Sequence, residues 1–319
     1  MSNPLLLYLI DSKVETTINT KQFQTIHSPQ EQSQTRLILF LLDGARPDYL
    51  FSNKSYGEWQ PLFPSLIQNN PNHTVCTTMH VDPPTSTIQG VKTLLTGGMR
   101  SFIELGESFF SSVLQSDHWI LQLRKHRNLT IAHVGDPLWR DLAGEDAFVN
   151  PISSIDSYNV YEDDSQSIQS TLESFLQVGG DLYQTDVLIV HSLLVDHNAH
   201  RTSSSSPANP SIRDSLLQFN RHLQYTISHL PSNTLLLIFG DHGLSQFGNH
   251  GGASEDEITT GLCAISSSYE LQPFSVGYDI QAVVWCSSLA YSSYSRFSSD
   301  HFLLLFISGS FHKYWICII

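Results

Sequence analysis

Four short runs of mostly apolar residues stand out along the chain, and each one ends at a glycine, histidine or aspartate. They are residues 37–42, 130–134, 187–190 and 235–239. Uninterrupted runs of this length are typical of parallel strands that are buried on both faces. We therefore predict that these four segments are strands of one central sheet.

Segments with helical character separate the predicted strands. They are residues 87–95, 116–126, 165–178 and 212–230. Strands that alternate with helices predict an α/β fold with a mostly parallel central sheet and helices on both faces. Ligands of such folds bind beyond the carboxyl ends of the strands. Asp43, Asp136 and Asp241 stand at such ends.

The pattern divides the chain into three parts. Residues 1–35 are mainly polar and predict a flexible lead-in, residues 36–300 predict the folded domain, and residues 301–319 are apolar. The apolar tail carries His312 and Lys313, which favours a core or edge segment, or the truncated start of a membrane region, over a complete span. The apolar run near Met1 is too short for an ordinary signal peptide or a spanning helix.

The acidic composition restricts the class of partner. The chain has 319 residues, 40% of them hydrophobic, and a formal charge of −14 from 30 acidic and 16 basic side chains. This length and apolar content allow a substantial core. The charge argues against a nucleic-acid partner and leaves no basic face for anionic lipid. A bound divalent cation would relieve part of the repulsion between the acids.

The cysteines and glycosylation sequons leave the cellular compartment open. The four cysteines lie far apart without a CxxC pair, so neither a cysteine zinc site nor a disulfide scaffold can be read from their spacing. Sequons for N-glycosylation begin at Asn53, Asn72 and Asn128. They permit glycans if the chain enters the secretory pathway.

Carboxylates and imidazoles in several short motifs form a candidate metal site. They are Asp43, Asp196, His200, Asp241, His242 and His250. Asp196 and His200 are four residues apart, so a helical turn places them on one side. Each motif alone is more often a turn or a surface feature. Their joint placement at one sheet edge predicts a two-metal site, for which this ligand mixture favours Zn²⁺ over Mn²⁺.

A candidate nucleophile lies in residues 82–97, where a Pro-Pro segment opens into a predicted helix. Thr85, Ser86 and Thr87 stand at the start of this helix. Free N–H groups there favour a phosphate or an alkoxide, and metal coordination makes a hydroxyl a competent nucleophile. The alternative interpretation is that these three side chains only cap the helix.

These motifs together resemble a known family. The chain is similar to the GPI ethanolamine phosphate transferases of the alkaline phosphatase superfamily, in consistent order over about residues 36–265. The matching segments are Leu-Asp-Gly-Ala-Arg-Pro-Asp at 42–48 and residues 82–97, 134–139, 195–200 and 240–255. The resemblance implies an alkaline-phosphatase-like fold.

The resemblance also implies an activity and its setting. It implies transfer of phosphoethanolamine from phosphatidylethanolamine to a mannose of the GPI glycolipid precursor, with a lumenal catalytic domain at the endoplasmic reticulum membrane. The Asp-Pro-Pro-Thr-Ser-Thr run at 82–87 is most similar to the member that modifies the third mannose. Two divalent ions, with Zn²⁺ favoured, and a small stabilising membrane subunit are the implied cofactors and partner.

Residue roles follow from the same resemblance. Thr87 is the implied nucleophile, preferred over Thr85 because its distance from Thr96-Gly97 matches the spacing in the superfamily. Asp136 and His197 lie close to these motifs in the sequence, which suggests orientation of the site or contact with the substrate amine; the alternatives are simple helix capping and, for His197, a side chain that points away from the metals. The implied ligands are Asp43, Thr87, Asp241 and His242 for one ion and Asp196, His200 and His250 for the other.

Two other functions remain open. Family members begin with a signal anchor and continue into a multi-span membrane region, and neither is evident here, so an inactive truncated chain is one alternative. The other is a phosphodiesterase or phosphatase that uses the same metals with water as acceptor. A sulfatase would need a Cys/Ser-x-Pro-x-Arg context, which residues 85–89 do not offer.

Overall fold

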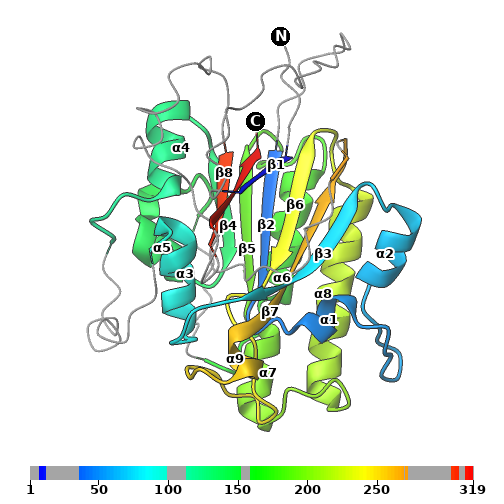
Figure 1. Ribbon diagram of the computed structural model, residues 1–319. Helices are drawn as coiled ribbons and strands as arrows, with labels where there is room; N and C mark the ends of the chain where they lie inside the picture. The colour runs from blue at the N-terminus through cyan, green and yellow to red at the C-terminus, as the bar shows by residue number, and fades with distance from the viewer. Residues whose placement is uncertain are drawn as a thin grey trace.

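A six-stranded sheet forms the centre of the computed structural model (Figure 1), with strand order β3-β7-β6-β2-β5-β4. The structure describes residues 36–98, 113–151, 159–268 and 270–271, together with the backbone of three further strands near the chain ends. The predicted α/β fold with a mostly parallel sheet is confirmed, since three of its five strand pairings are parallel.

The four predicted strands are all present and run parallel to one another. They are β2 (Arg36–Leu42), β4 (Ile131–Gly135), β5 (Val187–Ser192) and β6 (Thr234–Phe239). Two antiparallel strands, β3 (Thr74–His80) and β7 (Thr259–Ser266), complete the sheet. The sequence analysis did not predict these two, because their threonines and glycine interrupt the apolar pattern.

The four predicted helices are present within a few residues of their predicted bounds. They are α3 (Thr87–Thr96), α4 (Trp119–Arg127), α6 (Ser165–Leu176) and α8 (Pro210–Ser228). The described residues also contain shorter helices. These are α1 (Pro47–Phe51), α2 (Phe63–Asn69), α5 (Leu138–Ala143), α7 (Leu194–Thr202), α9 (Glu255–Ile258) and the 3₁₀ helix η3 (Glu145–Ala147).

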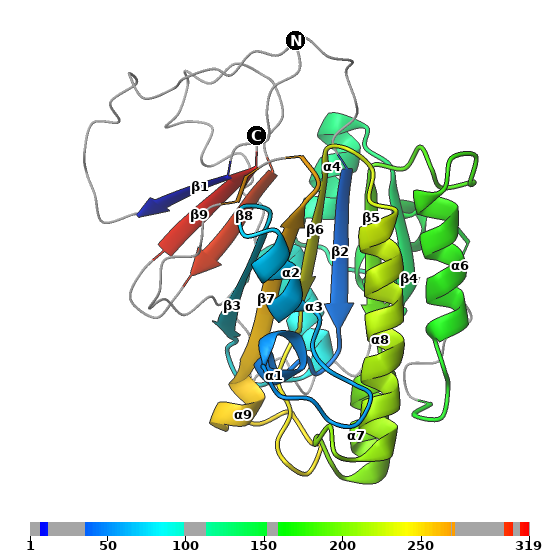
Figure 2. The ribbon, with the colours of Figure 1, turned by 90° about the vertical axis from the view of Figure 1, so that its right-hand side faces the viewer.

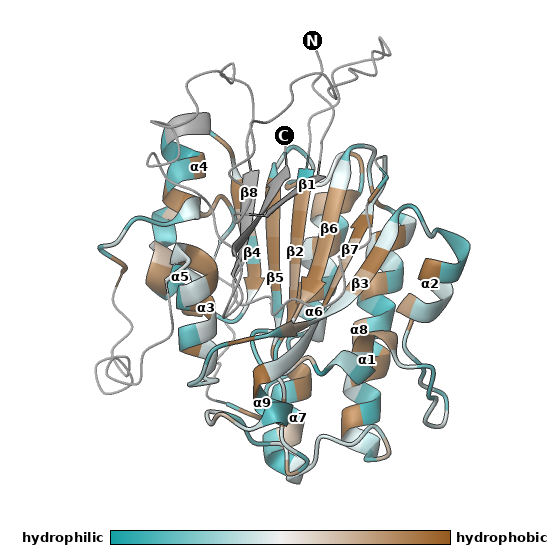
Figure 3. Ribbon diagram, viewed as in Figure 1, coloured by the Kyte–Doolittle hydropathy of each residue, from teal (hydrophilic) through white to brown (hydrophobic). Residues whose placement is uncertain are grey.

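The sheet is buried on both faces, as its parallel strands require. Alternate residues of β2 enter two separate cores: Leu39 packs with residues of α3, α4 and α5, whereas Phe40 packs with residues of α1, α2, α6 and α8. Figure 2 shows α6 and α8 covering one face of the sheet. Figure 3 shows that the central strands are the most hydrophobic part of the ribbon. Burial on both faces explains why these strands read as continuous apolar runs.

Three further strands lie near the chain ends. Residues 7–11 of the predicted lead-in form strand β1 (Leu7–Asp11), and the apolar tail contains β8 (Leu303–Ser308) and β9 (Lys313–Ile318). These three pair in an antiparallel sheet of order β1-β9-β8. The rest of residues 1–35 and 301–319, and all of 272–300, lie outside the described residues. Of the helices that the structure describes, none is both long and apolar enough to cross a membrane.

A disulfide joins Cys76 on β3 to Cys263 on β7. The two cysteines face each other in the antiparallel register of these strands, although 187 residues separate them along the chain. The sequence analysis found no disulfide because spacing along the chain carries no information about this pairing. The partner of each cysteine is determined by the order of strands in the sheet.

Candidate active site

The predicted site residues gather at one edge of the sheet, beyond the carboxyl ends of its parallel strands. Asp43 directly follows β2, and the pair Asp241-His242 follows β6. Asp196 and His200 lie on α7, which begins just after β5, and His250 lies in the loop between β6 and β7. Parallel strands end at a common edge, which explains how motifs separated by two hundred residues meet.

Thr87 lies beside the first group of ligands. Its Oγ1 atom is 3.4 Å from Oδ2 of Asp43 and 3.4 Å from Nε2 of His242. The same Nε2 atom is 3.2 Å from Oδ1 of Asp43 and 3.3 Å from Oδ2 of Asp241. Asp43, Asp241 and His242 form a group whose ligand atoms could hold one metal ion. All three side chains are buried.

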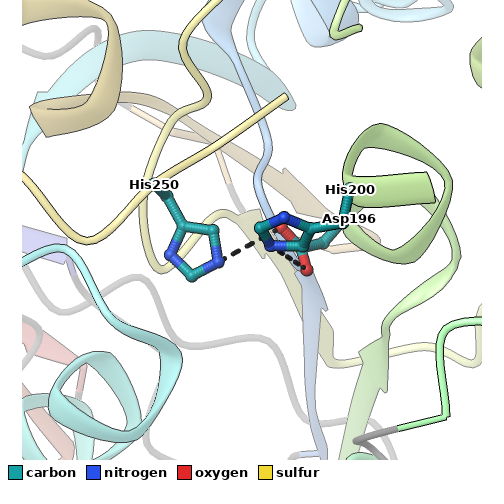
Figure 4. A group of neighbouring side chains, drawn as sticks. All are labelled: Asp196, His200 and His250. Atoms are coloured by element: carbon teal, nitrogen blue, oxygen red, sulfur yellow. Dashed lines mark ion pairs between the residues drawn. The ribbon is translucent and has the colours of Figure 1, made fainter. Parts of the chain in front are cut away.

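The second group consists of Asp196, His200 and His250, which point toward one another in Figure 4. Oδ2 of Asp196 lies 3.4 Å from Nε2 of His200, and its Oδ1 lies 3.5 Å from Nε2 of His250. The His200 side chain keeps 34% of its exposure, compared with 8% for Asp196. This group therefore lies closer to solvent than the first one.

The two groups adjoin. The rings of His242 and His250 stack with centroids 3.8 Å apart and planes inclined by 14°, and the His200 and His250 rings have centroids 4.9 Å apart. Adjacent ligand sets of this kind suit two ions that act on one phosphoryl group. The structure thus brings the seven residues predicted as ligands into two neighbouring groups.

Hydrogen bonds to backbone carbonyls determine which ring nitrogen of His242 and of His250 carries a proton. Nδ1 of His242 lies 2.9 Å from the carbonyl of Gly243, and Nδ1 of His250 lies 2.7 Å from the carbonyl of Thr85. A carbonyl only accepts, so each Nδ1 carries a proton, and whenever the ring is neutral its Nε2 directs a lone pair toward carboxylate oxygens. Imidazole lone pairs and carboxylate oxygens are both hydrogen-bond acceptors and cannot bond to each other. Their close approach in a buried site suits a metal cation that binds to both.

The shifted pKa values of the site residues also favour a bound cation. Burial would lower the pKa of His242, but Asp241 and Asp43 raise it to about 9, so the acids draw positive charge to this position. Burial and the charge of Asp43 raise the pKa of Asp196 well above its usual range. Burial and His242 lower the pKa of His250 to about 3. At neutral pH His250 therefore offers an uncharged nitrogen, and a cation would stabilise the buried carboxylates.

Two glycines allow the strand-end turns to pack closely. Gly44 has φ +70° and its N–H donates to Oδ1 of Asp241 at 3.3 Å. A Cβ atom on Gly240 would lie 2.3 Å from Oγ1 of Thr260 and 2.7 Å from Cβ of Ala45. The Asp-Gly and Gly-Asp sequences at the two strand ends therefore join the β2 and β6 turns into one support for the first group.

The positions of the two threonines separate their roles. Thr85 is fully buried, and its hydroxyl donates to the carbonyl of Gly252 at 3.0 Å and accepts the N–H of Gly251 at 2.9 Å. Thr87 instead begins α3 after the N-cap residue Ser86, with its hydroxyl in the first ligand group. Thr85 fastens the loop that carries His250, whereas the Thr87 hydroxyl faces the first ligand group.

A third group lies behind the first one and includes a histidine that the sequence analysis did not select. His191 on β5, Asp43 and Asp136 place ligand atoms close together, and all three are buried. Oδ1 of Asp136 accepts the N–H of Leu138 at 2.9 Å, and burial raises the pKa of Asp136 to about 6. The signal for His191 was its position at the end of a predicted strand, which we interpreted only as a stop.

The two residues predicted to orient the site or contact substrate are both buried. Asp136 is 1% exposed and lies next to His191, and His197 is 3% exposed on α7. The backbone N–H of His197 donates to the carbonyl of Leu193 at 2.9 Å. Contact of either side chain with substrate stays a prediction.

Comparison with known proteins identifies relatives of the chain. No protein-family model matches it. The catalytic subunit of GPI ethanolamine phosphate transferase 3 from Mus musculus is 32% identical over 242 residues, which cover 72% of this chain and 21% of the mouse protein. GPI ethanolamine phosphate transferase 3 from Schizosaccharomyces pombe is 31% identical over 230 residues, covering 71% and 24%. The chain thus spans between a fifth and a quarter of the length of these curated relatives.

A solved structure supports the fold. The structure of a 2-O GAG sulfatase superposes with a TM-score of 0.50 at 9% identity, covering 87% of this chain and 78% of the sulfatase. At this identity the likeness concerns the fold alone, and it agrees with the predicted alkaline-phosphatase-like architecture. Fold, motif order and sequence similarity therefore converge, and the chain belongs to the family of GPI ethanolamine phosphate transferases.

Proposed function

We propose that this chain transfers phosphoethanolamine from phosphatidylethanolamine to a mannose of the GPI glycolipid precursor through a phosphothreonine at Thr87. The observation that carries the proposal is the position of the Thr87 hydroxyl, 3.4 Å from both Asp43 and His242 at the start of α3. The names of the curated relatives supply the substrate class, which the geometry alone would leave open.

The donor atoms fit two divalent metal ions, and the mixture of carboxylate and imidazole favours Zn²⁺. When bound, such ions activate the hydroxyl and neutralise the charge that develops on the attacking and departing oxygens. Asp43, Thr87, Asp241 and His242 would hold one ion, and Asp196, His200 and His250 would hold the other. Within the group of Asp43, Asp241 and His242, and likewise within the group of Asp196, His200 and His250, the ligand atoms lie within 4.8 Å of one another.

The protein's own residues account for a two-step transfer. In the first step Oγ1 of Thr87 forms a bond to phosphorus, the bond from phosphorus to the glycerol oxygen breaks, and diacylglycerol leaves with the proton that Thr87 gives up. In the second step a mannose hydroxyl attacks the phosphothreonine, the Oγ1–phosphorus bond breaks and the threonine is restored. N–H groups in the first turn of α3 stabilise the phosphoryl charge in both steps.

Two features support a lumenal location for this domain. The Cys76–Cys263 disulfide suits an oxidising compartment. The sequon residues Asn53, Asn72 and Asn128 are all exposed, as glycan attachment requires. We propose that the domain acts in the lumen of the endoplasmic reticulum on membrane lipids and modifies the third mannose, with a small membrane subunit as a partner. The similarity to the transferases named 3 supports the choice of mannose.

The test is incubation of the zinc-loaded chain with phosphatidylethanolamine that carries labelled ethanolamine, followed by peptide mass spectrometry. We expect a phosphoethanolamine adduct on Thr87, and none in Thr87→Ala, whose metal content stays near that of the unmodified chain. The matched control is Ser86→Ala, because Ser86 precedes Thr87 and its side chain makes no capping hydrogen bond. This variant keeps the adduct.

The other outcomes separate the competing functions. A Thr87→Ala chain with full transfer would exclude Thr87 as nucleophile. Release of free phosphoethanolamine at the same rate with and without a mannose acceptor would indicate a hydrolase. Metal binding without any adduct would indicate an inactive chain.

A further inference from the structure

His191 lies beside Asp43, a residue of the first ligand group. It is the last residue of β5 that pairs with β4, opposite Gly135, and its side chain is fully buried. Nε2 of His191 is 3.4 Å from Oδ2 of Asp43. That same oxygen lies 3.4 Å from the Thr87 hydroxyl. His191 and the proposed nucleophile therefore meet at one carboxylate oxygen.

The indole of Trp139 determines which nitrogen of His191 carries the proton. Nε1 of Trp139 lies 3.1 Å from Nδ1 of His191. An indole N–H only donates, so Nδ1 of His191 accepts and the proton of the neutral ring sits on Nε2. In its neutral form His191 therefore directs the N–H of Nε2 toward Asp43, whereas the neutral forms of His242 and His250 direct lone pairs toward their carboxylates.

This difference in tautomer excludes His191 as a metal ligand, although its position beside Asp43 and Asp136 suggests a third ion site. A protonated nitrogen has no lone pair for a metal. Nδ1, the other nitrogen, is occupied by Trp139 and lies 3.9 Å from Oδ2 of Asp136. The ring is thus arranged to donate to a ligand rather than to act as one.

The backbone around His191 leaves the ring little freedom. The N–H of Asp136 donates to the carbonyl of His191 at 3.2 Å. Gly135 has φ +107°, and a Cβ atom there would lie only 1.8 Å from that carbonyl oxygen. The close approach places α5, which carries Trp139, over the end of β5. The sequence Gly135-Asp136-Pro137-Leu138-Trp139 therefore acts as a unit that holds His191.

We propose that His191 is a positioning residue, whose Nε2 faces Oδ2 of Asp43 at 3.4 Å and so orients this carboxylate beside the Thr87 hydroxyl. Trp139 fixes the tautomer that makes this possible. The resulting chain of contacts runs from Trp139 through His191 and Asp43 to Thr87. The proposal rests on the proposed transfer function and adds an orienting partner behind a ligand of its metal site.

Paired substitutions test which nitrogen of His191 matters. Glutamine places its amide nitrogen near the position of Nε2, whereas asparagine places it near Nδ1. We expect His191→Asn and His191→Leu to lower kcat about 10–100-fold with little change in the KM for phosphatidylethanolamine. We expect His191→Gln to retain kcat within a fewfold. Equal losses in His191→Gln and His191→Leu would overturn the proposal, because they would show that only the shape of the ring is needed.

A second pair tests the indole. Trp139→Phe removes the N–H and keeps an aromatic ring, and Trp59→Phe is its control, because Trp59 is equally buried at 1% exposure in the other core. We expect a loss in kcat of about tenfold for Trp139→Phe only. Equal losses in the two variants would assign the effect to packing and contradict the proposal.

Nitrogen-15 NMR of the histidine rings in the zinc-loaded chain gives a readout that does not depend on turnover. We expect His191 to carry its proton on Nε2, and Trp139→Phe to change this tautomer. A lone pair on Nε2, protons on both nitrogens, or a third equivalent of zinc lost in His191→Leu would overturn the proposal. The phosphothreonine at Thr87 would still form in each of those cases, so the proposed function would survive.

Discussion

The two ligand groups of the site differ in how far the fold encloses them. In the first group the Asp43, Asp241 and His242 side chains retain at most 1% of their exposure. In the second group His200 retains 34% and His250 retains 14%. The first group stands on strand ends that the core surrounds, whereas the second stands on α7 and on a loop.

This difference separates two tasks of one site. The enclosed group keeps the nucleophile and its carboxylates in a region of low dielectric, where electrostatic interactions are strong. The open group is the part of the site that solvent reaches, because His200 is 34% exposed. We infer that the enclosed group determines the chemistry of Thr87 and that the open group handles substrate exchange.

Among the substitutions that test this difference, removal of Asp241 should have the largest effect on metal binding and transfer. Asp241→Ala takes a buried carboxylate from the enclosed group, where water cannot easily take its place. We expect loss of one metal ion and a fall in the rate of transfer of about 10³-fold. A fall of this size corresponds to about 4 kcal/mol of lost stabilisation of the transition state. Metal analysis and a transfer assay measure both, with the exposed Asp256 of α9 mutated to alanine as control. Full metal content in Asp241→Ala would contradict the assignment.

Removal of His200 should have a smaller and reversible effect. Because His200 is partly exposed, water can occupy the ligand position in His200→Ala. We expect metal affinity at the second group to fall about 100-fold, and added Zn²⁺ to restore most of the transfer. Competition with a chelator measures the affinity. If excess Zn²⁺ rescues Asp241→Ala as well as His200→Ala, the two groups do not differ as we infer.

Reduction of the disulfide should affect stability more than chemistry. The Cys76–Cys263 bond closes a loop of 187 residues between strands β3 and β7. We expect its loss to lower the free energy of unfolding by about 2–4 kcal/mol. Urea titrations with and without reductant measure this change, and a chain with both cysteines replaced by alanine shows no response to reductant. Loss of metal on reduction under native conditions would show that the enclosed group depends on this edge of the sheet.

The last prediction concerns the pH dependence of stability and Asp164, which anchors the start of the helix that carries Asp196 and His200. Its Oδ2 accepts the N–H of Leu193 at 2.7 Å, just before α7, and burial raises the pKa of Asp164 to about 7. Since the folded pKa lies above the unfolded value of 3.8, the folded state holds the proton more tightly and this group's contribution to stability falls as pH rises from about 4 to 7.

Asp164→Asn should remove that part of the pH dependence. Urea titrations across this pH range measure it, with the exposed neighbour Asp163 changed to asparagine as control. An unchanged slope of stability against pH in Asp164→Asn would show that another group is responsible.

The sequence was most informative where chemistry coincides with a break in the hydrophobic pattern. Asp43 and Asp241 follow continuous apolar runs, so the common edge of a parallel sheet predicted that they meet. His191 escaped because it forms part of β5 and its role comes from contacts with Trp139 and Asp43. Such contacts join separate elements and have no fixed spacing along the chain.

The antiparallel strands were harder to predict for a related reason. In β7 the polar residues Thr259 and Thr260 and the flexible Gly261 precede the apolar part, so the segment lacks the continuous run of its neighbours. These residues contact the turn after β2. The Thr260 hydroxyl donates to the carbonyl of Ala45 at 2.5 Å, and the N–H of Gly261 donates to the same carbonyl at 3.2 Å. These bonds belong to the site's support and appear only once the strands are in place.

The loop between β6 and β7 has a consequence for how the site could vary among homologous sequences. Residues 240–258 contribute Asp241 and His242 to one ligand group and His250 to the other, and both ends of this loop are fixed in adjacent strands. The distance between the two groups is therefore limited by a short covalent tether. Insertions or deletions between residues 242 and 250 would change the spacing of the two ions, so length variation should be excluded here and accumulate in other surface loops.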